Sequence, residues 1–424
     1  MQKVLLIAVI LGLIICVAPP AMATNGDNLI GIGPISRSMG GVGIAAPQDA
    51  ISAVFSNPAA MCFGPYCPGS EFNFAGTLFM PTVNATVITA GAVANAGSDN
   101  KVFAIPAIGL SVPITSTFPL WRFGIAAYGV SGLGVDYRNT SIDGTFPSPP
   151  YPANTPLVAG AFTQLQTMKF APSVSYEPNE KLSLGLALNI DYSSLDLGSG
   201  SSFNYGIGVQ VGAIYKPSDT VSLGLTYISP QSVDYNNVLN LNGRISDLTL
   251  QAPQQVGIGI SVEPISNVLL MEVDGRWINW SSATGYNDFD WKDQWVLAVG
   301  AQYKPMKNLA LRIGYNYANN PVNVHNNFVG ATPAGPTFVS VQGALMPTYY
   351  YETFRIIGFP AIVKQHITVG GGYEFSKKFA LTAGYTHAFK ETISESGTNF
   401  AGQPTVLQST LSENSLEFGL TFRF

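Results

Sequence analysis

Segments in which apolar residues alternate with small or polar ones recur along most of the chain, and this period of two constrains the fold more than any other feature. Residues 181–192 read KLSLGLALNIDY, and residues 205–215 read YGIGVQVGAIY. Successive side chains of a strand point to opposite faces, so each segment has one apolar face and one mostly small or polar face. Similar segments occur at 221–227, 295–303, 309–317, 367–375 and 415–424. The pattern predicts strands that separate two different environments.

The low charge content indicates that one of these environments is lipid. Charged residues make up only 11% of the chain and apolar residues 46%, whereas a soluble domain carries about 25% charged residues. After residue 23, no run approaches the roughly 18 consecutive apolar residues of a spanning helix. Because only helices and closed β-barrels satisfy all backbone hydrogen bonds inside lipid, we expect a transmembrane β-barrel.

The first 23 residues have the pattern of a secretory signal peptide. Lys3 precedes an apolar stretch at 4–18, and Ala21-Met22-Ala23 forms a small-residue cleavage site. We therefore expect residues 1–23 to be removed, together with Cys16, and the mature chain to begin at Thr24.

Two cysteines would remain after this processing. Cys62 and Cys67 flank a Gly-Pro turn in CFGPYC, and export to an oxidising compartment favours a local disulfide between them. A metal site would need two further ligands of matching type, and none is nearby in the sequence. We expect neither a metal nor a cofactor, and the net charge of −5 argues against nucleic acid as a partner.

The connections between the predicted strands also repeat. Each has an aromatic or β-branched strand end, then a charge, usually Pro, and polar turn residues, as in YEPNEKLSL at 176, YKPSDTVSL at 215, VEPISNVLL at 262, YKPMKNLAL at 303 and YEFSKKFAL at 373. A sixth turn, SVPITSTFPLWRF, begins at 111. Six short turns joining strands two to thirteen predict an all-β, 14-stranded antiparallel barrel with both termini and the turns in the periplasm. Seven longer outer loops are then expected near 84–101, 132–162, 193–203, 230–250, 281–290, 319–364 and 390–413.

Residues 24–68 do not alternate and include a helix-like stretch at 46–56. This segment is too short and too Gly-rich to form a core of its own. We expect it to fill the lumen as an N-terminal plug, or hatch, with residues 69–424 forming the barrel.

Phe424 ends a strand of alternating aromatics, which is the pattern that the bacterial barrel-assembly machinery recognises, so we expect that machinery as a partner.

Several motifs resemble the FadL-type outer-membrane transporters of long-chain fatty acids and aromatic hydrocarbons. They are NLIGIGPISRSMGGVGIAAPQDA from 28, SNPAAM from 56, APQQVGIGI from 252, VDGRWINWS from 273, LRIGYNYANNPV from 311, FPAIVKQHITVG from 359 and the terminal Phe. The resemblance implies a 14-stranded barrel, a hatch, and passive uptake of hydrophobic molecules captured at the outer loops. It also implies release from a lumenal pocket sideways through the wall at a kinked third strand.

The resemblance assigns roles to particular residues. Asn57, Pro58 and Ala59 match the family's hatch motif, which lies next to the lateral exit. The third strand corresponds to residues 121–134, where four glycines would permit a kink: Gly124, Gly129, Gly132 and Gly134. The long loop at 319–364 departs from the best-known fatty-acid transporters, which leaves its role and the substrate open.

Charged residues on predicted inward faces have two readings. Glu272, Asp274 and Arg276 share one face of a strand. Arg276, Arg312 or Lys169 could bind a substrate carboxylate, or these cations could pair with the acids and hold the hatch in place. We favour the second reading, and an uncharged hydrocarbon would need no cation.

Two other classes of function fit the sequence less well. The three histidines, His325, His366 and His387, are not accompanied by a G-x-S-x-G motif, so we do not expect a barrel lipase, an acyltransferase or any other enzyme. A general porin would need a charged constriction and no plug.

We expect a monomer in the bacterial outer membrane, surrounded by its lipid and lipopolysaccharide.

Overall fold

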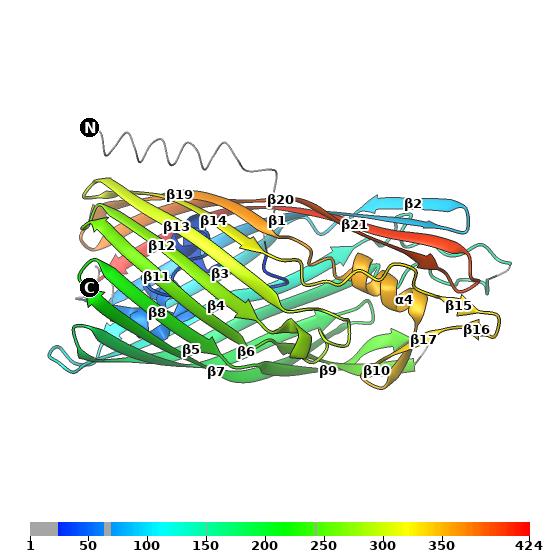
Figure 1. Ribbon diagram of the computed structural model, residues 1–424, viewed down its shortest axis with the longest axis horizontal. Helices are drawn as coiled ribbons and strands as arrows, with labels where there is room; N and C mark the ends of the chain where they lie inside the picture. The colour runs from blue at the N-terminus through cyan, green and yellow to red at the C-terminus, as the bar shows by residue number, and fades with distance from the viewer. Residues whose placement is uncertain (1–23, 63–68, 150, 242–243) are drawn as a thin grey trace.

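Fourteen antiparallel strands close into a barrel in the computed structural model, which describes residues 24–62, 69–149, 151–241 and 244–424 (Figure 1). The first strand, β1, pairs with both β3 and β21, so the ring is complete. The barrel strands are β1 (Glu71–Thr89), β3 (Phe103–Pro113), β4 (Leu120–Asp136), β5 (Phe162–Asn179), β6 (Leu182–Asp196), β7 (Ser201–Ser218), β8 (Val221–Ile228), β11 (Gln255–Ile265), β12 (Leu269–Ile278), β13 (Gln294–Met306), β14 (Leu309–Ala318), β19 (Gln365–Ser376), β20 (Phe379–Thr398) and β21 (Pro404–Arg423). The predicted fold class and strand number are confirmed.

The six short turns lie together at one end of the barrel, which we call the turn end, and the long connections lie at the opposite, loop end (Figure 1). Several of the predicted loops are wrong, because much of their sequence is strand. β1 continues to Thr89 and pairs with β2 (Ala92–Gly97), and a separate hairpin joins β9 (Gln231–Leu241) to β10 (Arg244–Ala252). These extensions carry many polar residues, so hydropathy does not reveal them, but their inward side chains, such as Val87, Val233 and Leu250, are buried in the hydrophobic cluster at the loop end.

The two faces of the barrel wall differ as the alternation predicts. Outward-facing apolar side chains are unusually exposed for a folded protein, as expected where lipid covers them. Examples are Leu184, Leu186, Leu188, Val209, Val211, Leu223, Leu225, Ile258, Ile260, Met271, Val273, Leu297, Leu311, Leu381, Leu416 and Phe418. The inward positions between them include buried Asn189, Gln210, Glu272, Asn316, Thr368 and Glu417.

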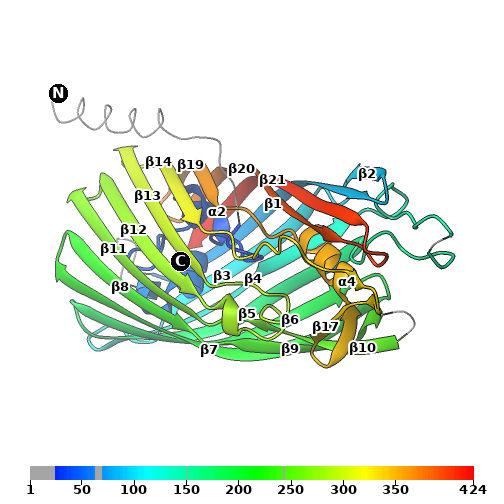
Figure 2. The same ribbon diagram turned by 45° about the vertical axis from the view of Figure 1, so that its right-hand side comes forward.

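The hatch occupies the lumen towards the turn end, where Figure 2 shows α2 inside the ring of strands. It comprises α2 (Gly33–Ser38), α3 (Ala50–Ser56) and the 3₁₀ turn η1 (Pro58–Cys62). Asp49 caps α3 by accepting a hydrogen bond from the Ser52 amide. Buried Arg37 donates to Glu417 and Ser415 of the last strand at 2.8 and 2.9 Å. The described helices are all too short to span a bilayer.

Glycines on the inner wall allow the hatch backbone to lie directly against the strands. A Cβ atom on Gly314 would lie 2.1 Å from the Gly40 nitrogen, and one on Gly224 would lie 2.1 Å from the Ile44 oxygen. Both distances are far below van der Waals contact, so no side chain fits at either position. The hatch and the wall are therefore in close contact on this side of the lumen.

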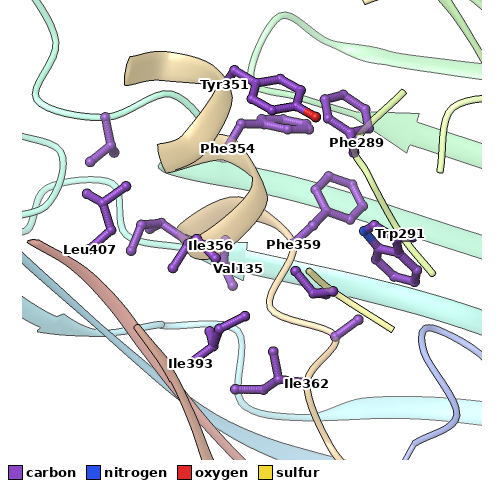
Figure 3. Packing of buried hydrophobic residues seen from close by; sticks show 14 of the residues in the cluster. Val135, Phe289, Trp291, Tyr351, Phe354, Ile356, Phe359, Ile362, Ile393 and Leu407 are labelled. Carbon is purple, nitrogen blue, oxygen red and sulfur yellow. The ribbon is translucent and has the colours of Figure 1, made fainter. Parts of the chain in front are cut away.

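The loop end holds a second closed layer, built from the connection between β14 and β19. This connection contains the short hairpins β15 (Ala331–Thr332)–β16 (Gly335–Pro336) and β17 (Phe338–Val341)–β18 (Ala344–Pro347), followed by α4 (Thr348–Thr353) and a π-helical turn η3 (Phe354–Gly358). Figure 3 shows Phe354, Ile356 and Phe359 packed against residues of the wall and neighbouring loops, among them Val135, Phe289 and Leu407. We call residues 348–358 the cap.

We predict that Gly314→Ala displaces the hatch, because its methyl group would overlap the backbone at Gly40. The variant should show a severalfold higher ion conductance in planar bilayers and faster proteolysis within the hatch.

The matched control for this variant is Gly275→Ala on the neighbouring part of the wall. The atom nearest to its added Cβ is Ile258 Cγ1 at 3.8 Å, which is ordinary contact. If both variants conduct as little as the unsubstituted protein, the close contact between wall and hatch is refuted.

Candidate functional site

The barrel wall is interrupted between β3 and β4. These strands pair from Pro113–Arg122 to Ala107–Tyr128, and beyond Tyr128 no residue of β3 pairs with β4. Past this point β4 continues to Asp136 and keeps its other neighbour, β5, with a shift of register between Gly129 and Ser131. The two edges meet again at the loop end, where the Asp99 amide donates to the Asp136 carbonyl at 2.8 Å. We call the interval at residues 129–135 of β4 the wall opening.

The start of the hatch supplies backbone partners inside this opening. The Leu29 amide donates to the Val130 carbonyl at 3.1 Å, and the Gly132 amide donates to the Asp27 carbonyl at 3.2 Å. Asn28 and Ser131 thereby form an isolated antiparallel bridge. Exposed backbone groups are costly in lipid, so this segment replaces the missing partner over part of the opening.

A cavity of about 450 Å³ passes through the opening. Its lining is mainly apolar and extends from the lumen, at Leu411, to the outer surface, at Val102, whose exposed fraction is 64%. The other apolar lining residues include Leu29, Phe79, Val83, Phe103, Ile105, Pro106, Leu133, Val135, Leu165, Met168 and Pro360. A hydrophobic molecule of moderate size matches this lining in character.

A second cavity, of about 70 Å³, lies in the lumen above the hatch. We call it the chamber. It shares Leu29, Ser131, Leu165 and Thr167 with the cavity of the wall opening, so the two spaces adjoin. Its apolar side chains include Phe55, Tyr128, Val233, Leu250 and Ile278, and its polar side chains include Lys169, Asp191, Gln231 and Arg276.

The polar residues of β12 hold the hatch backbone. Glu272 Oε1 accepts hydrogen bonds from the amides of Ala45 and Ala46 at 2.7 and 3.0 Å, and Asp274 Oδ2 accepts from those of Gly43 and Ile44 at 2.9 and 3.1 Å. Arg276 Nη2 donates to the Gly41 carbonyl at 3.1 Å. Each of these three side chains thus contacts the hatch in this structure.

Two further cations of the sequence analysis lie elsewhere on the wall. Arg312 on β14 donates to Gln302, which in turn donates to Gln48 of the hatch at 3.2 Å. Lys169 faces the chamber, where its Nζ donates to Gln231 at 2.7 Å and lies 3.5 Å from Asp191 Oδ1. An anion entering the chamber would therefore meet a lysine that already has an anionic partner.

The hatch motif lies away from the wall opening, which differs from the expected position. Asn57 Nδ2 donates to the carbonyls of Ile44, Ala213 and Leu225, at 2.8, 3.2 and 3.3 Å. A Cβ atom on Gly185 of β6 would lie 2.1 Å from the Ala59 nitrogen, so the motif packs against β6, β7 and β8. Pro58 begins η1 directly after Asn57.

The four glycines of β4 have different surroundings. A Cβ atom on Gly124 would lie 2.1 Å from Met61 of the hatch, below the opening. Gly129 is at the shift of register, and Gly132 and Gly134 lie within the opening.

The predicted disulfide cannot be compared with the structure, because Cys67 and the side chain of Cys62 are outside the described residues.

The cap is held by a buried group of charges that the sequence analysis missed. Arg355 Nη1 donates to Glu352 Oε2 and, at 3.1 Å, to Glu395 Oε1 of β20. His325 lies 2.9 Å from Glu352 through Nδ1 and 2.7 Å from Asp290 through Nε2. His325, Glu352 and Glu395 offer ligand atoms within 4.8 Å of one another, but the guanidinium of Arg355 already provides the positive charge between the two glutamates.

The stability of the cap should depend on pH through His325. Its hydrogen bond to Glu352 raises the pKa of His325 above the ordinary value of 6.5, more than partial burial lowers it. A raised pKa in the folded state means that the stabilisation is complete below pH 6.5 and is lost as the pH rises through the folded-state value. We predict that hydrogen exchange in the cap, corrected for intrinsic rates, becomes faster over this rise.

A His325→Gln variant serves as the control, because glutamine does not titrate. Its corrected exchange rates should change less with pH between about 6 and 8.5 than those of the unsubstituted protein, and the change that remains comes from the buried carboxyl group of Glu395 in the same cluster. The same pH dependence in both proteins would show that another group is responsible.

Comparison with known proteins relates this arrangement to a family. The family described as "Outer membrane protein transport protein (OMPP1/FadL/TodX)" matches residues 21–202 and 197–330. A comparison with curated protein sequences finds no significant match.

Similar solved structures share the fold over nearly their whole length. The toluene transporter TodX of P. putida has a TM-score of 0.64 at 18% identity, covering 93% of this chain and 99% of that chain. For a FadL homologue of Pseudomonas aeruginosa these values are 0.63, 16%, 96% and 99%, and for the toluene transporter TbuX of Ralstonia pickettii they are 0.61, 18%, 93% and 98%. With its sequence matched over most of its length, this chain belongs to the FadL/TodX family of bacterial outer-membrane transport proteins, which are channels rather than enzymes.

Proposed function

We propose that this protein is a passive channel that takes up hydrophobic small molecules, such as long-chain fatty acids or aromatic hydrocarbons, and releases them sideways into the outer membrane. The observation that carries the proposal is the interrupted β3–β4 ladder, with an apolar cavity of about 450 Å³ passing through it. Two similar solved structures are toluene transporters and a third is a FadL homologue, which supports the same class of substrate.

Sideways release suits the energetics of such a substrate. A hydrophobic molecule is more stable in the hydrocarbon of the bilayer than in the periplasm, so a path that ends in lipid runs downhill without ATP. The axial path is blocked where the hatch backbone contacts Gly224 and Gly314. These contacts also argue against a general porin, which would need an open aqueous lumen.

The route begins at the outer loops, continues through the chamber and ends at the wall opening. Leu29 borders both cavities, so movement of the leading hatch segment would join them. Among the described residues, two backbone hydrogen bonds, from Leu29 and Gly132, join this segment to β4 in the opening. The Asp27 carboxylate adds side-chain hydrogen bonds with Ser131 of β4 and with Tyr286. A backbone bond contributes about 0.5–1.5 kcal/mol and a bond to a carboxylate about 1.5–3 kcal/mol, so the segment moves only if these few bonds break together.

One chain forms the whole route, and we expect it to act as a monomer. The outer loops then face lipopolysaccharide, and the terminal strand would meet the barrel-assembly machinery during insertion. The paired state of Lys169 favours uncharged substrates over carboxylates in the chamber.

A disulfide across the wall opening tests sideways release directly. A Cβ atom on Gly129 would lie 3.8 Å from the Cβ of Ile105, which is the usual Cβ–Cβ distance of a disulfide. We predict that the oxidised double variant Ile105→Cys with Gly129→Cys loses most uptake of labelled toluene in cells, and that a reductant restores it.

The two single-cysteine variants are the controls, since they carry the same substitutions without a crosslink. They should take up toluene equally well with and without reductant. Full uptake by the verified crosslinked protein would exclude the wall opening as the exit.

A further inference from the structure

Within the cavity of the wall opening, one polar side chain has no role in the structure described so far. Glu413 of β21 is 3% exposed and lines the cavity opposite the β3–β4 gap. In the register of the wall it lies between Pro81 of β1 and Ala388 of β20, neither of which offers a side-chain partner. Its carboxyl makes no hydrogen bond with any described residue, and Oε2 is fully buried.

Glu417, on the same inward face of β21, is an example of a buried carboxyl that has hydrogen-bond partners. Glu417, four residues along the strand, accepts a hydrogen bond from Arg37 at 2.8 Å, and Ser415 accepts one from the same guanidinium. Three of the five N–H groups of Arg37 donate to Glu417, Ser415 and the Gly31 carbonyl, and the guanidinium attracts Glu413 without a hydrogen bond to it. Glu413, which follows Ser415 on this face, lines the cavity without such a hydrogen bond.

A buried carboxyl without a partner is costly, because it loses its hydrogen bonds to water and gains none from protein. The cost is removed if a molecule in the cavity donates a hydrogen bond to it. Asn100, which also lines this cavity, has a buried Nδ2 that lacks an acceptor. The cavity therefore combines an apolar lining with an unused acceptor and an unused donor.

The exit side of the cavity limits the charge of such a ligand. The lining reaches the outer face of the barrel at Ala104 and Pro106, which are exposed positions of β3. On the proposed route, a molecule that leaves between these strands enters hydrocarbon. A permanently charged ammonium or carboxylate group cannot do so cheaply, whereas a hydroxyl group can. A hydroxyl also donates to a carboxyl in either protonation state.

We propose that the wall opening contains a binding site in which Glu413 accepts a hydrogen bond from the hydroxyl of an uncharged hydrophobic molecule, a phenol or an alcohol. This inference rests on the proposed sideways route and specifies its substrate class. It predicts that the site distinguishes phenols and alcohols from hydrocarbons of the same shape, and that it disfavours carboxylates.

Three probes of similar size test the site: toluene, p-cresol and p-toluate. Equilibrium dialysis of the purified full-length mature protein in detergent measures binding without requiring transport. We expect the unsubstituted protein to bind p-cresol more tightly than toluene, and p-toluate most weakly. In Glu413→Leu, p-cresol binding should weaken about three- to tenfold, the effect of one lost hydrogen bond, while toluene binding stays the same or improves.

Glu413→Gln is the matched control, because its amide oxygen still accepts a hydrogen bond at the same position. It should retain most of the preference for p-cresol, and heat-modified migration in gels verifies that each variant has folded as a barrel. An unchanged ratio of p-cresol to toluene binding in all three proteins overturns the proposal. That result is also expected if the α-amino group of the processed chain at Thr24, which lines the same cavity, is the partner of Glu413.

Uptake by cells separates this inference from the proposed function. If the unsubstituted protein transports toluene and p-cresol but Glu413→Leu leaves their ratio unchanged, the site is refuted and the route stands. If neither compound enters faster than in cells without the protein, the proposed function fails regardless of the binding result. Binding of p-toluate as tight as that of p-cresol also contradicts the site.

Discussion

The structure depends on one constraint: a backbone hydrogen-bonding group that faces lipid must have a partner within the protein. The barrel meets it by closing β1 on both β3 and β21, so that no free edge remains along most of the wall. The exception is β4 beyond Tyr128, where β3 no longer pairs with it. The hatch segment at residues 27–29 fills part of this gap with backbone bonds of its own. This hatch segment lies in the lumen and still completes part of the wall. Its movement would open the wall without unfolding any strand.

The polar interior serves mainly to fix the hatch. Glu272 and Asp274 each bind two consecutive hatch amides, and Glu417 binds Arg37. Several such bonds in a buried setting keep the hatch against β12 and β21. Among the described residues, its leading segment is joined to β4 by two backbone bonds and through Asp27 to Ser131 and Tyr286. The cap packs at the loop end and the hatch at the turn end, and the interrupted β3–β4 ladder lies in the wall between them.

The fold could be predicted from the sequence because segments such as residues 181–192 alternate between lipid-facing and lumen-facing residues, and because the turns that connect them repeat. The inward direction of Glu272 and Asp274 follows from the same alternation. Alternation cannot reveal where a ladder stops, because Gly132 and Gly134 look like the many other wall glycines. Alternation also cannot show which strands of the wall a hatch residue contacts. The structure places Asn57 at β6 to β8, whereas the expected position was next to the opening. The importance of Glu413 depends on an absent partner, which only three-dimensional placement reveals.

The most direct test of sideways release is a crystal structure of the protein soaked with a halogenated aromatic, such as p-iodotoluene, with the iodine located by its anomalous scattering. The account predicts iodine sites in the chamber and in the cavity between β3 and β4, with none between the hatch and the β12–β14 wall. Iodine sites arranged along the barrel axis past the hatch to the turn end, with no iodine in the cavity beside β4, would contradict sideways release.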